Sequence, residues 1–154
     1  MELKRVVVTG LGAITPIGND VDTTWENAKA GVSGAGPITH FDASLFKTKF
    51  ACEVKNFNAS EHFDRKKERT LDLYAQYALV AARQAVADAK LEEEGAGVNK
   101  NRVGVIVAAG IGGLHTFEEE AGYYALNAEK GPKYNPFFIP KMIADIASGH
   151  ISME

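Results

Sequence analysis

Two short apolar runs constrain the fold more than any other feature of this 154-residue chain. They cover Arg5–Leu11, which contains three valines, and Val103–Ala108. Continuous apolar runs of this length are typical of strands buried on both faces of a sheet. Between them, apolar residues recur every three or four positions over Tyr74–Ala85 and predict a helix that fades near Lys90. Strands that alternate with helices predict an α/β domain with a parallel or mixed sheet flanked by helices.

Local signals mark the remaining elements. Asp22 is placed to cap a helix over Thr23–Ala30, and Gly31 is placed to end it. Glycine, serine and proline over Gly31–Asp42 predict a loop. The other predicted elements are a short strand at Phe50–Val54, a polar connection at Glu92–Asn101, a helix over Leu114–Asn127, an apolar loop or extended piece at Pro136–Pro140 and a helix over Met142–Met153.

Composition limits the class of protein. With 45% hydrophobic and 24% charged residues, the chain has the composition of a globular protein, and its length fits one domain. The net charge of -3 supports neither nucleic-acid nor membrane binding. The N-terminal apolar run breaks at Gly10, too early for a secretory signal. The single cysteine, Cys52, excludes a disulfide framework within this chain, so a reducing cytosol is the simplest compartment and we expect a cytoplasmic protein. Because the last helical pattern reaches Glu154 without a stop signal, we expect residues 1–154 to be the first part of a longer domain.

The glycines after the first run raise the question of a dinucleotide site. Gly10-Leu11-Gly12 follows a predicted strand, but Thr15 stands where that fingerprint has its third glycine, and Pro16 follows directly. No helix N-terminus is then placed to face a pyrophosphate. We therefore expect no cofactor, and we interpret the glycines as a tight turn with unusual backbone angles.

A second glycine-rich segment, Gly110–Gly113, follows the second predicted strand. Residues without a Cβ let the backbone approach a ligand closely, and a flexible turn explains the glycines equally well. Ile111 is the one large side chain among them and is a candidate hydrophobic gate. Further along, Phe137 and Phe138 lie between two prolines that restrict the backbone, so they are either core residues or the wall of an apolar pocket.

A cluster of basic residues stands out on this mildly acidic chain. Arg65, Lys66, Lys67 and Arg69 are opposed in sequence only by Glu68. Such a cluster is a candidate dock for an acidic partner, and a solvated helix face is the alternative interpretation.

No residue pattern by itself predicts a reaction. The four histidines have no metal-ligand spacing with one another or with Cys52, the single cysteine. Cys52 lacks a cationic neighbour or a helix N-terminus that would activate it, so we interpret it as a small core or strand residue. The residues alone predict neither a metal site nor a catalytic acid–base pair.

Several segments, in order along almost the whole chain, resemble the thiolase-like condensing enzymes and, among them, the beta-ketoacyl-acyl-carrier-protein synthase II family. They are Arg5–Gly12 with Thr15–Gly18, Trp25–Asn27, Gly34–Ile38 running on to Phe41-Asp42, Asp64–Lys66, Arg102–Val105, Gly110–Leu114, Asn135–Pro140 and Ser148–His150.

The resemblance implies an acyltransferase of fatty-acid elongation with a layered thiolase-like fold, of which this chain covers most of the N-terminal half. Members condense malonyl-carrier protein with an acyl thioester, and they use a cysteine and two histidines that lie beyond Glu154. The resemblance places Ile111 in the acyl pocket near the dimer interface, where it helps to set chain length, and it matches Phe138 to a mobile phenylalanine of the same pocket. It places Arg65, Lys66 and Arg69 where the acidic acyl carrier protein docks. It also implies a homodimer.

Two alternatives stay open within the resemblance. One is a non-catalytic chain-length partner subunit, which would lack the downstream cysteine, and the other is the ketosynthase of a polyketide synthase. A nucleotide-binding oxidoreductase is the alternative from a different class, and the missing third glycine argues against it.

Overall fold

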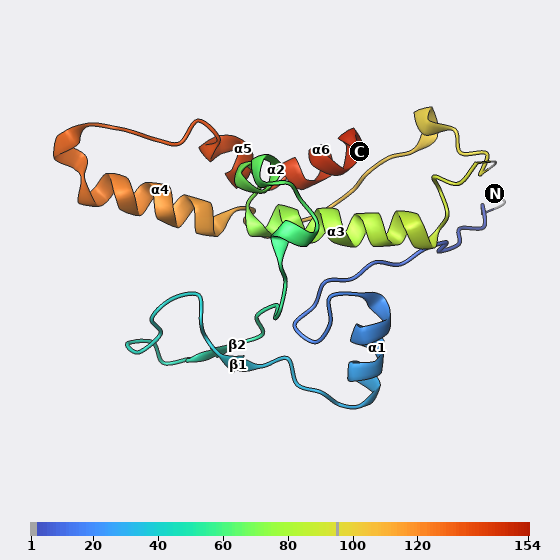
Figure 1. Cartoon of the computed structure of the whole chain (residues 1–154), viewed down its shortest axis with the longest axis horizontal. Helices are drawn as coiled ribbons and strands as arrows, with labels where there is room; N and C mark the ends of the chain where they lie inside the picture. Colours follow the sequence, from blue (N-terminus) through green and yellow to red (C-terminus); the bar gives the residue numbers. More distant parts are fainter. Residues whose placement is uncertain (1–2, 95) are drawn as a thin grey trace. The chain divides into compact units, whose positions relative to one another are not determined.

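The structure is a computed structural model that describes residues 3–94 and 96–154. Contacts divide the chain into two compact units. The first holds the residues up to Phe57 together with Val80–Gly97, and the second holds Asn58–Leu79 together with Val98–Glu154. The long helix α3 (Leu73–Asp88) gives its first turns to the second unit and the rest to the first (Figure 1).

The first unit begins its regular structure with helix α1 (Val21–Lys29). Asp20 caps this helix, because its Oδ1 accepts a hydrogen bond of 2.7 Å from the Thr23 amide. The expected cap, Asp22, lies inside the first turn instead, where its negative charge interacts favourably with the helix dipole. The helix has ended before Gly31, as predicted.

The sheet of the described residues is one small antiparallel pair in the first unit. Strand β1 (Gly36–Pro37) pairs with β2 (Phe50–Ala51), with Gly36 opposite Ala51. The strand predicted over Phe50–Val54 is therefore shorter, and the loop predicted over Gly31–Asp42 contains β1. Cys52 directly follows β2 and is exposed, which corrects its interpretation as a core residue.

The strand predicted at Arg5–Leu11 does not form. This segment has no regular secondary structure and no ladder partner in the part of the chain that the structure describes, and Val6 is 90% exposed. It lies instead against the C-terminal half of α3, where Asp88 accepts a hydrogen bond of 2.8 Å from the Leu11 amide. A Cβ on Gly12 would lie 1.9 Å from the Ala81 carbonyl oxygen. The glycines here permit close contact with a helix. Neither Gly10 nor Gly12 has a positive φ, so the interpretation as a turn with unusual backbone angles was wrong.

The second unit consists mainly of helices. In chain order they are the 3-10 turn η1 (Ala59–Glu61), α2 (Arg65–Thr70), the start of α3, the 3-10 turn η2 (Lys100–Arg102), α4 (Leu114–Leu126), the 3-10 turn η3 (Ala128–Lys130), α5 (Phe138–Met142) and α6 (Ile146–Met153). Phe63, Leu71, Ala75, Leu79 and Ala147 are its buried apolar residues. Helices α3 and α4 agree with their predicted ranges within a few residues. Gly95, within the predicted connection before η2, lies outside the described residues.

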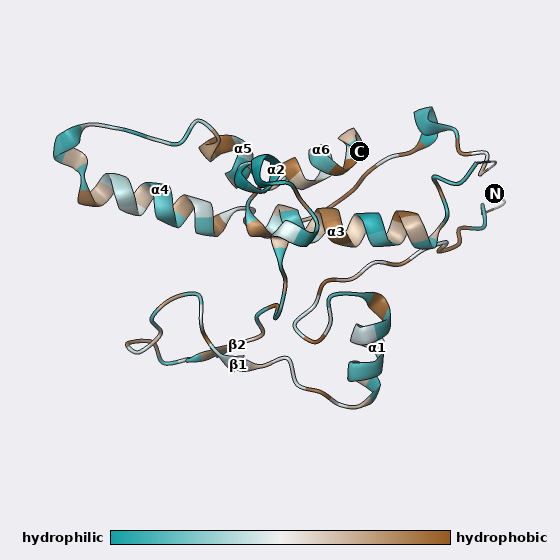
Figure 2. Ribbon diagram, viewed as in Figure 1, coloured by the Kyte–Doolittle hydropathy of each residue, from teal (hydrophilic) through white to brown (hydrophobic). Residues whose placement is uncertain are grey.

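The strand predicted at Val103–Ala108 also does not form, because no second strand pairs with it among the described residues. The segment has no regular secondary structure and no neighbouring strand among the described residues, and Ile106 is 97% exposed. It is held at Val107, whose amide donates to the Ser148 hydroxyl of α6 at 3.2 Å. Figure 2 shows this stretch as a hydrophobic trace between η2 and the helices.

The C-terminal helical region is divided, where the sequence predicts a loop followed by one helix. The Asn135 side chain accepts a hydrogen bond of 2.9 Å from the Phe137 amide and so turns the chain into α5. Pro140 lies in the first turn of α5, where the missing amide hydrogen is not needed. Ile143, with a ψ of 136°, ends α5 before α6 begins. No helix of the described residues is long and apolar enough to cross a membrane.

Candidate functional site

Helix α2 presents the basic cluster of the second unit. Asp64 caps it, because one carboxylate oxygen accepts hydrogen bonds of 2.8 Å from the amides of both Lys66 and Lys67. These amide hydrogen bonds hold the pKa of Asp64 below its ordinary value. The cap fixes the register of a helix too short to be stable alone, and Arg65, Lys66 and Arg69 project from it into solvent.

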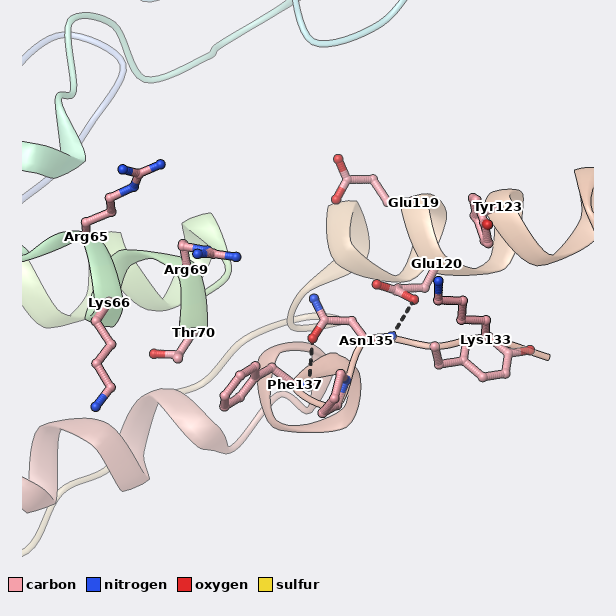
Figure 3. Close-up of a pocket in the computed structure, with 12 residues that line it drawn as sticks. Arg65, Lys66, Arg69, Thr70, Glu119, Glu120, Tyr123, Lys133, Asn135 and Phe137 are labelled. Carbon is pink, nitrogen blue, oxygen red and sulfur yellow. Dashed lines mark hydrogen bonds between the residues drawn. The ribbon is translucent and has the colours of Figure 1, made fainter.

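The same three residues line one wall of a groove of about 1340 Å³ (Figure 3). The opposite wall belongs to α4, and the floor to the segment that returns from α4 to α5. Figure 3 shows Arg65 and Lys66 extending in opposite directions from α2. The complete lining is Arg65, Lys66, Arg69, Thr70, Glu119, Glu120, Tyr123 and the segment 133–137.

The charge of the groove is positive. Four basic side chains, the three from α2 and Lys133, line it against two carboxylates. One of the carboxylates, Glu120, accepts a hydrogen bond of 3.0 Å from the Asn135 amide. No ion pair among the described residues engages Arg65, Lys66 or Arg69. The guanidinium and ammonium groups of α2 are therefore available to an anionic partner.

Phe138 lies beside this groove in a stack of aromatic rings. Its ring centroid is 5.7 Å from that of Tyr134 and 6.4 Å from that of Phe117 on α4. Tyr134 in turn contacts Tyr124, with centroids 5.7 Å apart. The stack ties α5 and the return segment to α4. Phe137, by contrast, faces the groove and is 48% exposed.

Ile111 is apart from the groove, with 66% of its surface exposed. The glycines after it contact the chain itself. Gly112 has a φ of +86°, and a Cβ on it would lie 2.3 Å from the Met142 carbonyl oxygen. The Gly113 amide donates to that same oxygen at 2.9 Å. Ile111 and Phe138, the two predicted pocket residues, thus lie on segments that this hydrogen bond joins.

The structure offers no metal centre within the described residues, since it brings no three histidine, cysteine or acidic side chains together as ligands. His150 on α6 lies near α2 instead, with its Nδ1 3.4 Å from the Lys67 ammonium nitrogen. Burial and then this cation lower the pKa of His150.

The sequence predicted the basic wall of the groove and proposed Phe137 of its floor as a pocket residue, but it did not predict the wall that α4 supplies. Tyr123 and Glu119 fall on the helix predicted over Leu114–Asn127, but nothing in their spacing relates them to α2. Lys133 carries a weak signal, as a basic residue just after the helix-breaking Gly131-Pro132. Only the return of the chain after α4 brings it to the groove.

Comparison with known proteins gives one consistent family. The model of the beta-ketoacyl synthase N-terminal domain matches residues 3–154. A 3-oxoacyl-[acyl-carrier-protein] synthase 2 of Staphylococcus aureus (strain COL) is 47% identical over 155 residues, covering 98% of this chain and 36% of that protein. The chain therefore spans about a third of the length of such relatives.

Solved structures show the same fold. The ishigamide ketosynthase/chain length factor is 30% identical, with a TM-score of 0.73 over 96% of this chain and 36% of the other. A type II polyketide synthase acyl-carrier protein in complex with its ketosynthase matches with a TM-score of 0.74 and 24% identity, over 98% of this chain and 38% of the other. The second likeness shows the fold alone.

Proposed function

We propose, from the premise that this chain belongs to the beta-ketoacyl synthase family, that it forms the N-terminal third of a 3-oxoacyl-acyl-carrier-protein synthase. The observation that carries the proposal is the 47% identity to a synthase of that name over 98% of the chain. The substrates are a malonyl thioester and an acyl thioester. Loss of carbon dioxide from the malonyl group supplies the electron pair that forms the new carbon–carbon bond, and the acyl thioester bond breaks.

The chemistry itself belongs to residues outside this chain. The family resemblance implies a nucleophilic cysteine at a helix N-terminus, where the dipole lowers the pKa of the thiol, and two histidines that stabilise the developing negative charge. We assign no catalytic residue to residues 1–154. What this chain contributes is part of the acyl pocket and a docking surface.

We assign carrier-protein docking to Arg65, Lys66 and Arg69. An acyl carrier protein is acidic, and these three cations line a positive groove without an ion-pair partner in the described part of the chain. Opposite charges on two partners raise the rate of encounter and fix the register of the complex. Phe137 and Tyr134 supply an exposed apolar surface in the same groove.

We assign the acyl pocket to Ile111 and Phe138. Ile111 is a mostly exposed side chain on a glycine turn, and Phe138 is held by aromatic stacking on a helix joined to that turn. Two apolar side chains on joined segments fit a pocket that holds an acyl chain.

The whole protein is, in this proposal, a cytoplasmic homodimer with a layered fold. Residues 1–154 form the first part of its synthase domain. The two apolar segments, 5–11 and 103–108, then become strands of a mixed sheet when further chain pairs with them. Their exposed valines and Ile106 support this, because strand-forming residues without a partner leave apolar surface open to water.

The test is a condensation assay on full-length protein that carries this chain, with malonyl- and acyl-carrier protein as substrates and mass spectrometry of the 3-oxoacyl product. We expect turnover. The charge reversals Arg65→Glu and Arg69→Glu together should raise the KM for carrier-bound substrate by about tenfold or more and leave turnover of a carrier-free thioester unchanged. Lys47→Glu together with Lys49→Glu, a reversal of two exposed cations of the first unit, is the matched control. Absence of any condensation by the wild-type protein would refute the proposed function.

A chain-length partner subunit is the second candidate, because a ketosynthase/chain length factor is also 30% identical to this chain. Such a subunit would bind an acyl thioester without condensing it alone. Labelling of the full-length protein with a thiol-reactive acyl analogue distinguishes the two, since only the synthase would form a covalent adduct at an activated cysteine.

A further inference from the structure

Asp72 is a buried carboxylate, 5% exposed, in the residue that precedes α3. Its Oδ1 accepts a hydrogen bond of 3.2 Å from the Tyr74 amide, one of the first amides of α3. Helix amides in the first turn have no partner within their own helix, so this bond caps α3.

The other oxygen of Asp72 serves a second helix. Its Oδ2 accepts from the amide of Thr116 at 3.1 Å and from the Thr116 hydroxyl at 2.5 Å. Thr116 is the third residue of α4, and the residue before that helix is Gly113, which has no side chain to cap it. A single carboxylate therefore holds the beginnings of α3 and α4 together, which lie side by side in Figure 1. Its negative charge is favourable at both helix N-termini.

The glycine turn of Ile111 is enclosed by this arrangement. A Cβ on Gly113 would lie 3.0 Å from the Asp72 carboxylate and 2.6 Å from the Lys141 carbonyl oxygen. The Gly113 amide is bonded to the Met142 carbonyl at the end of α5. The turn is therefore held between Asp72 on one side and the end of α5 on the other.

Tyr74 extends the connection to the other pocket segment. Its hydroxyl donates a hydrogen bond of 2.5 Å to the Ile143 carbonyl, which follows α5. The first turn of α3 thus contacts α4 through Asp72 and the end of α5 through Tyr74. Ile111 and Phe138 lie on the two segments that are anchored in this way.

We propose that Asp72 is a positioning residue that fixes the glycine turn and so sets where Ile111 limits the acyl pocket. The role in acyl-length selection rests on the proposed function. The anchor, by which we mean the hydrogen bonds of Asp72 to the beginnings of α3 and α4, does not depend on it. Asp72 touches no substrate in this account. It acts through Thr116 and Gly113, and its removal would let the turn and Ile111 move.

The test compares Asp72→Asn with Asp88→Asn in full-length protein. Asp88 is the matched control because it also lies on α3 and also accepts a backbone amide, that of Leu11. The measurement is the ratio of kcat/KM for a long and a short acyl thioester in competition. An amide in place of the carboxylate keeps one acceptor and presents hydrogens to the other helix, so we expect the ratio to change by about tenfold in Asp72→Asn. It should stay within about twofold in Asp88→Asn. An unchanged ratio in Asp72→Asn, or the same change of the ratio in Asp88→Asn, would overturn the proposal.

A second variant tests the proposal if Asp72→Asn misfolds, and a second measurement tests it if the protein is inactive. Thr116→Val removes the hydroxyl hydrogen bond and keeps the backbone one, so it should change the ratio in the same direction by a smaller factor. Hydrogen exchange at the amides of residues 113–117 needs no activity. It should accelerate in Asp72→Asn and not in Asp88→Asn, and unchanged exchange would refute the anchor. Accelerated exchange in a protein that never condenses would leave the anchor standing and the proposed function wrong.

Discussion

Helix α3 and the segment 103–109 are both apolar and are separated in sequence by the polar connection 92–101, yet only one of them is a regular element. Along α3 the backbone amides bond to carbonyls of the same helix, and Ala75 and Leu79 are fully buried. The segment 103–109 has no regular secondary structure, with Val103 55% and Ile106 97% exposed. The backbone amide and carbonyl of Val107 form hydrogen bonds with the Ser148 hydroxyl, which is a side chain and not a neighbouring strand.

The difference follows from where each element finds its hydrogen-bond partners. A helix finds its backbone hydrogen-bond partners within itself, four residues away, so no second segment has to supply them. A strand needs another strand beside it, and a segment with the right residues but no neighbour stays unpaired. The segment 5–11 shows the same behaviour in the first unit. We infer that both segments are strands of the complete synthase domain.

The largest expected difference between α3 and the segment 103–109 is in the rate of amide hydrogen exchange. In the 154-residue chain, amides in the middle of α3 should exchange at least about a hundredfold more slowly than those of residues 103–109, since that ratio needs only about 3 kcal/mol of local opening free energy. In full-length protein the gap should close as the segment gains a partner strand. Mass spectrometry of exchanged peptides measures both. Equally fast exchange of 103–109 in the full-length protein would show that the segment is not a strand.

Paired truncations would test the same contrast by stability. Leu79→Ala removes a fully buried side chain and should lower the free energy of unfolding of the chain by about 2–5 kcal/mol. Ile106→Ala removes a side chain that is almost fully exposed, and its effect should stay within about 0.5 kcal/mol. Urea unfolding followed by circular dichroism gives both values. In full-length protein Ile106→Ala should become clearly destabilising, and a cost there no greater than in the chain would contradict the strand assignment.

Acid should lower the stability of helix α6, which holds the segment 103–109, and this effect should be smaller than that of Leu79→Ala. Helix α6 carries Ser148, which holds Val107, and His150, which lies beside Lys67 of α2. Burial and the Lys67 cation lower the pKa of His150 from its ordinary 6.5, so the unfolded chain takes up the proton first. Stability should therefore fall as the pH drops from about 6.5 to the lowered pKa of His150, and it should level off below that value.

NMR titration of the His150 ring with thermal melts across this range measures the effect. His150→Gln is the control, because it removes the titrating group and keeps a polar side chain. A pH dependence that is the same in His150→Gln would assign the effect to another group.

The helices were predictable because their signals are local. The apolar spacing over Tyr74–Ala85 predicted α3, and the helix predicted over Leu114–Asn127 corresponds to α4. The cap of α1 was misplaced by two residues because Asp20 and Asp22 both suit a cap by sequence, and only the backbone conformation of Asp20 decides between them. Of the candidate site, the basic wall was predictable from four neighbouring residues. The role of Asp72 was not, because its second partner, Thr116, is 44 positions away.

The sequence by itself determined the family, the main helices and the basic cluster, because these depend on residue order and on contacts within a few positions. Tertiary structure decided the rest. It placed the groove between α2 and α4, it made Gly12 and Gly112 points of close contact, and it brought one carboxylate to two helix ends. Each of these depends on segments far apart in the chain meeting at a distance of a few ångströms. Nothing in the local pattern of either segment specifies such a meeting.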